Sequence, residues 1–137
     1  MALVGGGTGG FANTVNPAGT GTSLNYIGNH CYAYSGVITP GGAASADTTA
    51  LQFTTGNSYA MVEINWTCMS TSATVDQYFQ MSMDSQIIFN ARAEDDESAT
   101  SQSPIKVLIP PFTKVEVKVG DAAANDMSVI LAGRVYA

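Results

Sequence analysis

The alternation of apolar and polar residues is clearest near the carboxyl end of the chain. Residues 113–119 alternate between a valine-rich set and a charged set: Thr113, Val115, Val117 and Val119 against Lys114, Glu116 and Lys118. A period of two residues places one set on the dry face of a β-strand and the other on its wet face. Pro110 and Pro111 precede this run and cannot donate backbone hydrogen bonds, so we expect them to turn the chain from one sheet edge to the next.

The strand that contains this run is predicted over 112–119. Further β-patterned segments, bounded by Gly, Pro and Asn, are predicted along most of the chain, at 25–39, 50–54, 58–69, 77–84, 86–92, 104–109 and 127–136. In the strongest of these, 58–69, the residues expected to face inward are Ala60, Val62, Ile64, Trp66 and Cys68. In 25–39 they are Cys31, Ala33, Ser35 and Val37. Since no window of ten residues has a helical period, the pattern predicts an all-β fold, an antiparallel β-sandwich of jelly-roll type with about eight strands.

Residues 1–23 differ from the rest of the chain in composition. They consist largely of Gly, Thr, Asn and Ala, and Phe11 and Val15 are the only sizeable apolar residues after Val4. Such a segment cannot bury enough apolar area to offset its ordering entropy. We therefore predict a flexible arm over 1–23 and a sandwich domain over 24–137.

The charge of the chain narrows the classes of partner. Only 12% of the residues are charged, and the net charge is −6. Nucleic-acid binding is disfavoured because phosphate contacts need a concentrated positive face. The amino terminus lacks the basic and apolar regions of a secretory signal, and no apolar run is long enough to cross a membrane. A reducing cytosol is then the default, in which Cys31 and Cys68 are buried thiols, with a disulfide between them as the alternative.

Groups that could carry chemistry are few. A catalytic triad would have to use His30, the single histidine, for which a hydrogen-bonded structural role is the simpler interpretation. The run Glu94 to Glu97 could gather a calcium ion but lacks the spacing of a binding loop, so a solvated loop is expected. Asp84 and Glu63 are the strand-associated carboxylates considered as an acid pair. We predict no catalytic residue, no cofactor and no metal.

The apolar residues at outward positions are more informative than any motif. Along a strand, odd and even positions face opposite sides, and we call this alternation the parity of the strand. Seven large apolar residues have the parity opposite to the core residues: Tyr59, Met61, Met69, Ile88, Leu108, Ile130 and Tyr136. On a chain with so few charges, this set indicates a second buried surface. We expect a subunit interface formed by Tyr59, Met61, Leu108, Ile130 and Tyr136. The alternative is a sandwich covered by its own arm and loops.

The segments Ile109 to Val117 and Val129 to Tyr136 resemble the closing strands of small β-sandwich proteins that decorate the capsids of tailed bacteriophages. The Gly- and Thr-rich segment 1–23 is similar to the arms that such decoration, or cement, proteins extend over neighbouring capsid subunits. The resemblance implies a non-enzymatic protein, made in the host cytoplasm, that binds the viral major capsid protein on the outer capsid surface of the virion, commonly as a homotrimer. Phe11, Asn13 and Val15 are the candidate capsid-binding residues.

A carbohydrate-binding module, such as a lectin-like fibre domain, is the alternative from another functional class. Tyr32, Tyr34 and Tyr59 could supply the flat faces on which sugars stack. This alternative requires the three rings to be exposed together in one groove.

Overall fold

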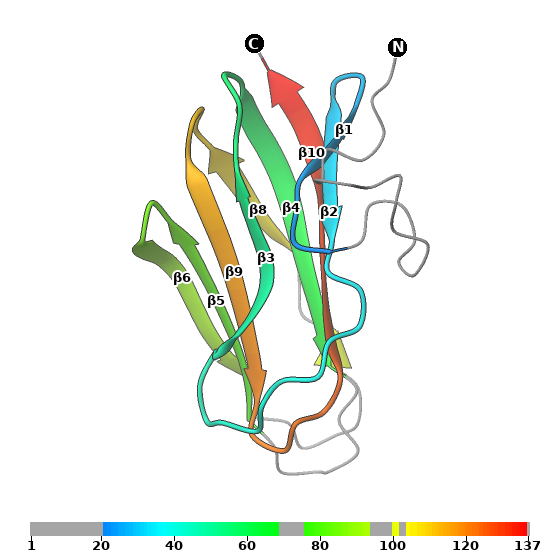
Figure 1. The fold of residues 1–137 in the computed structure, drawn as a ribbon, viewed down its shortest axis with the longest axis vertical. Helices are drawn as coiled ribbons and strands as arrows, with labels where there is room; N and C mark the ends of the chain where they lie inside the picture. Colours follow the sequence, from blue (N-terminus) through cyan, green and yellow to red (C-terminus); the bar gives the residue numbers. More distant parts are fainter. Residues whose placement is uncertain (1–20, 69–75, 94–99, 102–103, 137) are drawn as a thin grey trace.

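Two antiparallel sheets pack face to face in the computed structural model, which describes residues 21–68, 76–93, 100–101 and 104–136 (Figure 1). The strands are β1 (Asn25–Ile27), β2 (His30–Tyr34), β3 (Thr48–Thr54), β4 (Tyr59–Cys68), β5 (Gln77–Met83), β6 (Gln86–Ala93), β7 (Thr100–Ser101), β8 (Ile105–Ile109), β9 (Lys114–Asp121) and β10 (Met127–Tyr136). The predicted all-β sandwich is therefore confirmed. Within these ranges no helix is long and apolar enough to cross a membrane.

Sheet A has the strand order β1-β2-β10-β4, and β7 and β8 both pair with the remaining edge of β4. Sheet B has the order β3-β9-β5-β6. Four of the pairs are nested in sequence, because β5 pairs with β6, β4 with β8, β3 with β9 and β2 with β10. The chain thus crosses repeatedly from one sheet to the other, and the last strand returns beside one of the first.

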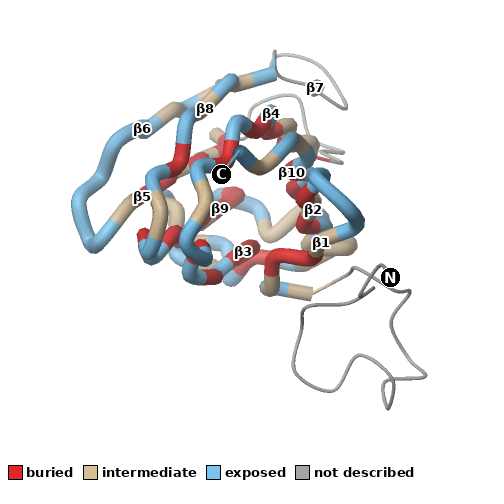
Figure 2. Tube along the Cα trace, turned by 90° about the horizontal axis from the view of Figure 1, so that it is seen from above, coloured by how far each residue is buried: buried red, intermediate tan, exposed pale blue. Residues whose placement is uncertain are grey.

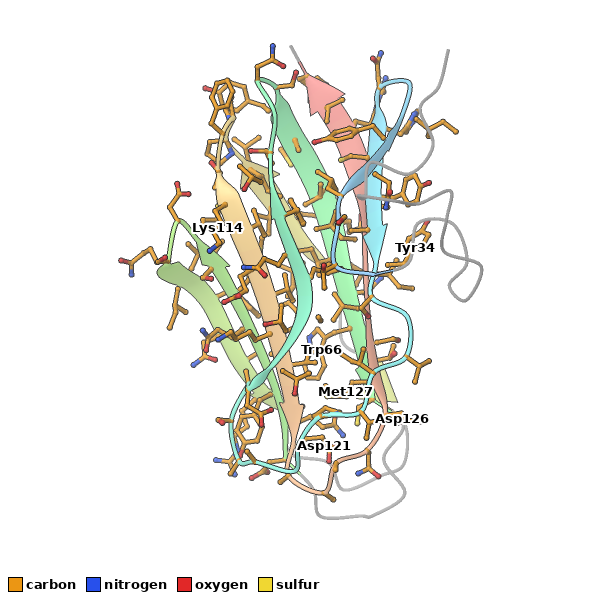
Figure 3. The ribbon with its side chains drawn as sticks, in the orientation of Figure 1. Tyr34, Trp66, Lys114, Asp121, Asp126 and Met127 are labelled. Carbon is orange, nitrogen blue, oxygen red and sulfur yellow. The ribbon has the colours of Figure 1, made fainter. Side chains whose placement is uncertain are left out.

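The core lies between the sheets and is formed by the inward halves of the alternating strands (Figure 2). In β4, every residue predicted to face inward is buried, from Ala60 to Cys68. The Trp66 ring stacks on Phe79 of sheet B at a centroid separation of 5.6 Å, and Figure 3 shows it between the two layers. The single tryptophan is therefore a core residue, as predicted.

The segment 25–39, predicted as one strand, is instead a hairpin followed by a loop. Gly28 has a φ of +56°, which turns β1 back along β2. After Tyr34 the chain leaves β10 at Gly36, which has a φ of +69°, and touches it again only through a single bridge between Ile38 and Met127. Parity holds only within a strand, so the inward prediction for Val37 is wrong, and this residue is 73% exposed.

The turn between β8 and β9 carries the chain from sheet A to sheet B, and a network of buried threonines fixes it. Thr55, in the turn between β3 and β4, donates its hydroxyl to the Pro110 carbonyl oxygen at 2.7 Å. The same hydroxyl oxygen accepts from the Thr113 backbone N–H at 2.9 Å. β9 therefore begins at Lys114, and Phe112, which we predicted within the strand, lies in the turn with a φ of +55°.

Candidate functional site

Among the described residues, half of the exposed large apolar side chains lie on the outer face of sheet A. We use this name for the outward side chains of β2, β10, β4 and β8. The five residues predicted as a subunit interface all lie on it and are about half exposed: Tyr59 49%, Met61 45%, Leu108 50%, Ile130 49% and Tyr136 51%. Of the other off-parity residues, Ile88 is exposed on β6 in sheet B, and Met69 lies outside the described residues.

Strand register brings four of these five residues together. Tyr59 lies opposite Tyr136 on β10, and Met61 lies opposite Leu108 on β8. Because Tyr59 and Met61 are two residues apart on β4, the two pairs occupy adjacent rows of one face. Ile130 lies apart from these four residues. The β10 residue opposite Met61 is Arg134, and Ile130 is four residues further along the strand.

Few charges interrupt this surface. Glu63, Lys106 and Arg134 are its charged residues, and among the described residues none of them forms an ion pair. Two of its strands have ten residues and two have five, so strand spacing and rise give the face an area of about 500 Å². This is less than the ~800 Å² that each partner buries in an interface of standard size. The face by itself therefore fits a small protein interface, and an interface of standard size would extend beyond it.

A second apolar area extends the face around Ile130. Ile130 lies opposite Tyr34 of β2, and a shallow depression beside them is lined also by Gly36 and Val37. We missed Val37 because we extended the parity of β2 past its end. The Ser35-Gly36 pair was the sequence signal for that end.

The three tyrosines considered for sugar stacking do not share one groove. The rings of Tyr32 and Tyr34 lie 5.2 Å apart on β2 and are inclined by 40°. Tyr59 lies on β4, two strands away from β2. The β4 residue level with Tyr32 across the sheet is Glu63, and Tyr59 lies four residues along β4 from it. Strand spacing and rise therefore separate Tyr59 from Tyr32 by about 16 Å.

The groups weighed for catalysis are not brought together. His30 is exposed on the outer face of sheet A, and its ring makes no hydrogen bond with any described residue, so the predicted hydrogen-bonded role is wrong. Glu63 belongs to sheet A, whereas Asp84 lies in the β5–β6 turn of sheet B and accepts from the Lys114 backbone N–H at 2.9 Å. Residues 94–97 lie outside the described residues, which contain no group of three potential metal ligands.

An open cleft at one end of the sandwich separates the turn between β1 and β2 from the turn between β3 and β4. Its lining includes Tyr26, Gly28, residues 54–58 and Val135, with no charged side chain. Burial raises the pKa of the Tyr26 hydroxyl, and the nearby Cys31 thiol raises it further. Burial also raises the pKa of Cys31. Both groups therefore keep their protons at neutral pH, and neither is activated as a nucleophile.

At the opposite end, the buried Asp121 organises the loop between β9 and β10 (Figure 3). Its Oδ1 accepts hydrogen bonds from the Ala123 N–H at 2.8 Å, the Asn125 N–H at 3.2 Å and the Asn125 side-chain amide at 3.1 Å. Its Oδ2 accepts from the buried Cys68 thiol at 3.0 Å. Cys68 and Cys31 form no disulfide, in agreement with the prediction of buried thiols. This cluster is enclosed and holds a loop in place, which is a structural role.

No protein-family model matches the chain, and no curated protein is similar to it in sequence.

Proposed function

We propose that the protein is a non-enzymatic virion component that binds and stabilises the outer surface of a phage capsid as an oligomeric decoration protein. The observation that carries this proposal is the outer face of sheet A, where Tyr59, Met61, Leu108 and Tyr136 form one apolar area. Monomeric proteins seldom leave such a contiguous area open to water. We propose that a second copy of the chain covers it within the oligomer.

The sandwich is proposed to be of jelly-roll type, the form common in viral capsid domains. The nested pairing of β2 with β10, β3 with β9, β4 with β8 and β5 with β6 supports this. A long hairpin that is rolled into two layers produces nested pairs of this kind, in which strands near the two ends of the sequence, here β2 and β10, lie side by side.

Attachment to the capsid is proposed to use the amino-terminal arm. Phe11, Asn13 and Val15 are the candidate anchors, and they lie outside the described residues. Several arms on one oligomer would act together, because each bound arm raises the effective concentration of the next. Weak contacts of single arms then add up to stable decoration.

Sedimentation of capsid shells tests the proposal. Shells assembled from the major capsid protein of the same genome are mixed with the purified chain, pelleted and analysed for bound protein. We expect saturable, stoichiometric binding that Phe11→Ala weakens measurably. The matched control is Phe112→Ala, which removes an aromatic ring that is 72% exposed at the tip of the β8–β9 turn. Absence of saturable binding by the folded wild-type protein contradicts the proposal.

Carbohydrate binding is a second candidate, favoured by the close Tyr32 and Tyr34 rings beside the depression at Ile130. In this case a glycan array would show saturable binding that Tyr34→Ala abolishes. Tyr59→Ala would leave that binding unchanged, because its ring lies in a different part of the face. An array without a bound glycan excludes this second candidate.

A further inference from the structure

β6 is an edge strand with an unusually apolar and exposed sequence. Among the described residues it pairs only with β5, and Figure 2 shows it at the outer margin of sheet B. Three consecutive large side chains on it are exposed: Ile87 51%, Ile88 45% and Phe89 36%. The edge therefore combines a row of backbone donors and acceptors with apolar side chains, which favours pairing with another strand.

The features that usually protect an edge strand are weak here. β6 is eight residues long and contains no lysine or proline. Its one charged side chain, Arg92, already binds Asp76 at 2.7 Å. A bulge at Ile88 interrupts the register with β5, but the pairing is regular from Phe89 to Ala93. These five residues leave a straight edge available to a partner.

We infer that β6 pairs edge to edge with β6 of a second copy, antiparallel about a two-fold axis. This contact would join the two copies of sheet B into one continuous sheet, running from β3 of one copy to β3 of the other. An isologous contact of this kind needs no second binding surface, because each copy supplies the same strand.

The sequence of β6 suits antiparallel self-pairing better than parallel pairing. With Ala91 on the two-fold axis, Phe89 lies opposite Ala93 of the partner subunit, and Asn90 lies opposite Arg92 of the partner subunit. The small side chain at the centre permits close approach, and no like charges meet. A parallel pair in register would place the two Arg92 side chains side by side, which is unfavourable.

This contact lies on a different sheet from the surface used in the proposed function and does not rest on it. Sheet A remains free for other contacts when the β6 edges pair. On a capsid, a two-fold contact between oligomers would link neighbouring decoration sites, and the linked layer would then strengthen the shell.

Light scattering during size-exclusion chromatography, over a series of protein concentrations, tests the inference. The test variant is Ile88→Lys combined with Asn90→Lys, which places two charges on the edge. The control is Ala44→Lys combined with Gln52→Lys, which adds the same charge at exposed positions outside β6 and outside the outer face of sheet A. We expect the β6 variant to form a smaller assembly than the wild type, of half its mass where β6 pairing alone joins two copies, whereas the control keeps the wild-type mass. Circular dichroism and thermal unfolding establish that each variant is folded.

The outcome separates this inference from the proposed function. If sheet A also mediates self-association, the β6 variant keeps the oligomer held by sheet A and loses the contacts between such oligomers; if it does not, a dimer becomes a monomer. Equal masses for the wild type and the folded β6 variant at every concentration overturn the inference. If the variant does not fold, hydrogen exchange of the wild type decides. Amides of 86–93 must exchange more slowly as the concentration rises, and unchanged exchange overturns the inference.

Discussion

Replacing Asp121 with alanine should weaken the sandwich far more than the same change at a neighbouring aspartate. The substitution removes a buried carboxylate that accepts four hydrogen bonds, from Ala123, Asn125 and Cys68. Hydrogen bonds to a charged acceptor contribute ~1.5–3 kcal/mol each, although such contributions are not additive. The Ala123 and Asn125 donors that remain are only partly buried and can reach water, and the buried Cys68 thiol is a weak donor. We therefore expect the free energy of unfolding to fall by about 3 kcal/mol.

Asp126 supplies the matched control in the same loop. It is exposed and accepts one hydrogen bond, from the Thr39 hydroxyl at 2.6 Å. Asp126→Ala changes the net charge by the same amount as Asp121→Ala, yet should cost only about 0.5–1 kcal/mol. The loss in free energy of unfolding for Asp121→Asn should lie between those for Asp126→Ala and Asp121→Ala, because the amide oxygen can still accept the three hydrogen bonds from Ala123 and Asn125.

Urea unfolding followed by the fluorescence of Trp66, the single tryptophan, measures these differences. Trp66 is buried in the core, so its emission reports the loss of tertiary packing. The slope against urea should stay constant, which would show that the stability changes and not the unfolded state. Equal losses for Asp121→Ala and Asp126→Ala would refute the idea that the buried carboxylate organises this end of the sandwich.

Three further predictions concern backbone packing, alkaline stability and the arm. Gly133→Ala would press a methyl group against the backbone of β4, 2.6 Å from a Cα atom, and should cost about 1–3 kcal/mol in urea unfolding. Gly56→Ala has no neighbour within 4 Å and should not show this loss. Because burial raises the pKa of both Cys31 and Tyr26, the folded chain holds these protons more tightly than the unfolded chain. The stability that this difference contributes is fully present below the ordinary thiol pKa of 9.0 and is lost as the pH rises through the raised pKa values of the folded chain. The urea midpoint should therefore decrease over this pH range, and a constant midpoint contradicts the prediction. Deleting residues 2–15 should leave the urea midpoint unchanged and sharply lower the number of chains bound per capsid shell; undiminished binding would assign attachment to the sandwich.

Much of the fold could be predicted because one face of most strands is buried and the other is wet. This contrast gave the inward residues of β4 and β9 correctly. It failed at Val37, where the chain had left the sheet, and at Phe112, which occupies a left-handed turn position uncommon for a bulky residue. Parity says which side a residue faces only while the strand continues.

The candidate surface could be predicted in part. The outward positions of Tyr59, Met61, Leu108, Ile130 and Tyr136 followed from parity, and all five are exposed. Their grouping could not be predicted, because it depends on which strands are neighbours and in what register. The β6 edge is a similar case, since strand order is set by the whole fold and not by the residues of one strand.

Electron cryomicroscopy of capsid shells incubated with the purified chain tests the proposed decoration of the capsid. We predict oligomers of the sandwich on the outer surface of the shell, with the outer face of sheet A covered by a second copy and the amino-terminal residues in contact with capsid subunits. Shells that stay bare at saturating concentrations of folded protein, or bound chains that leave Met61 and Leu108 open to solvent, would contradict it.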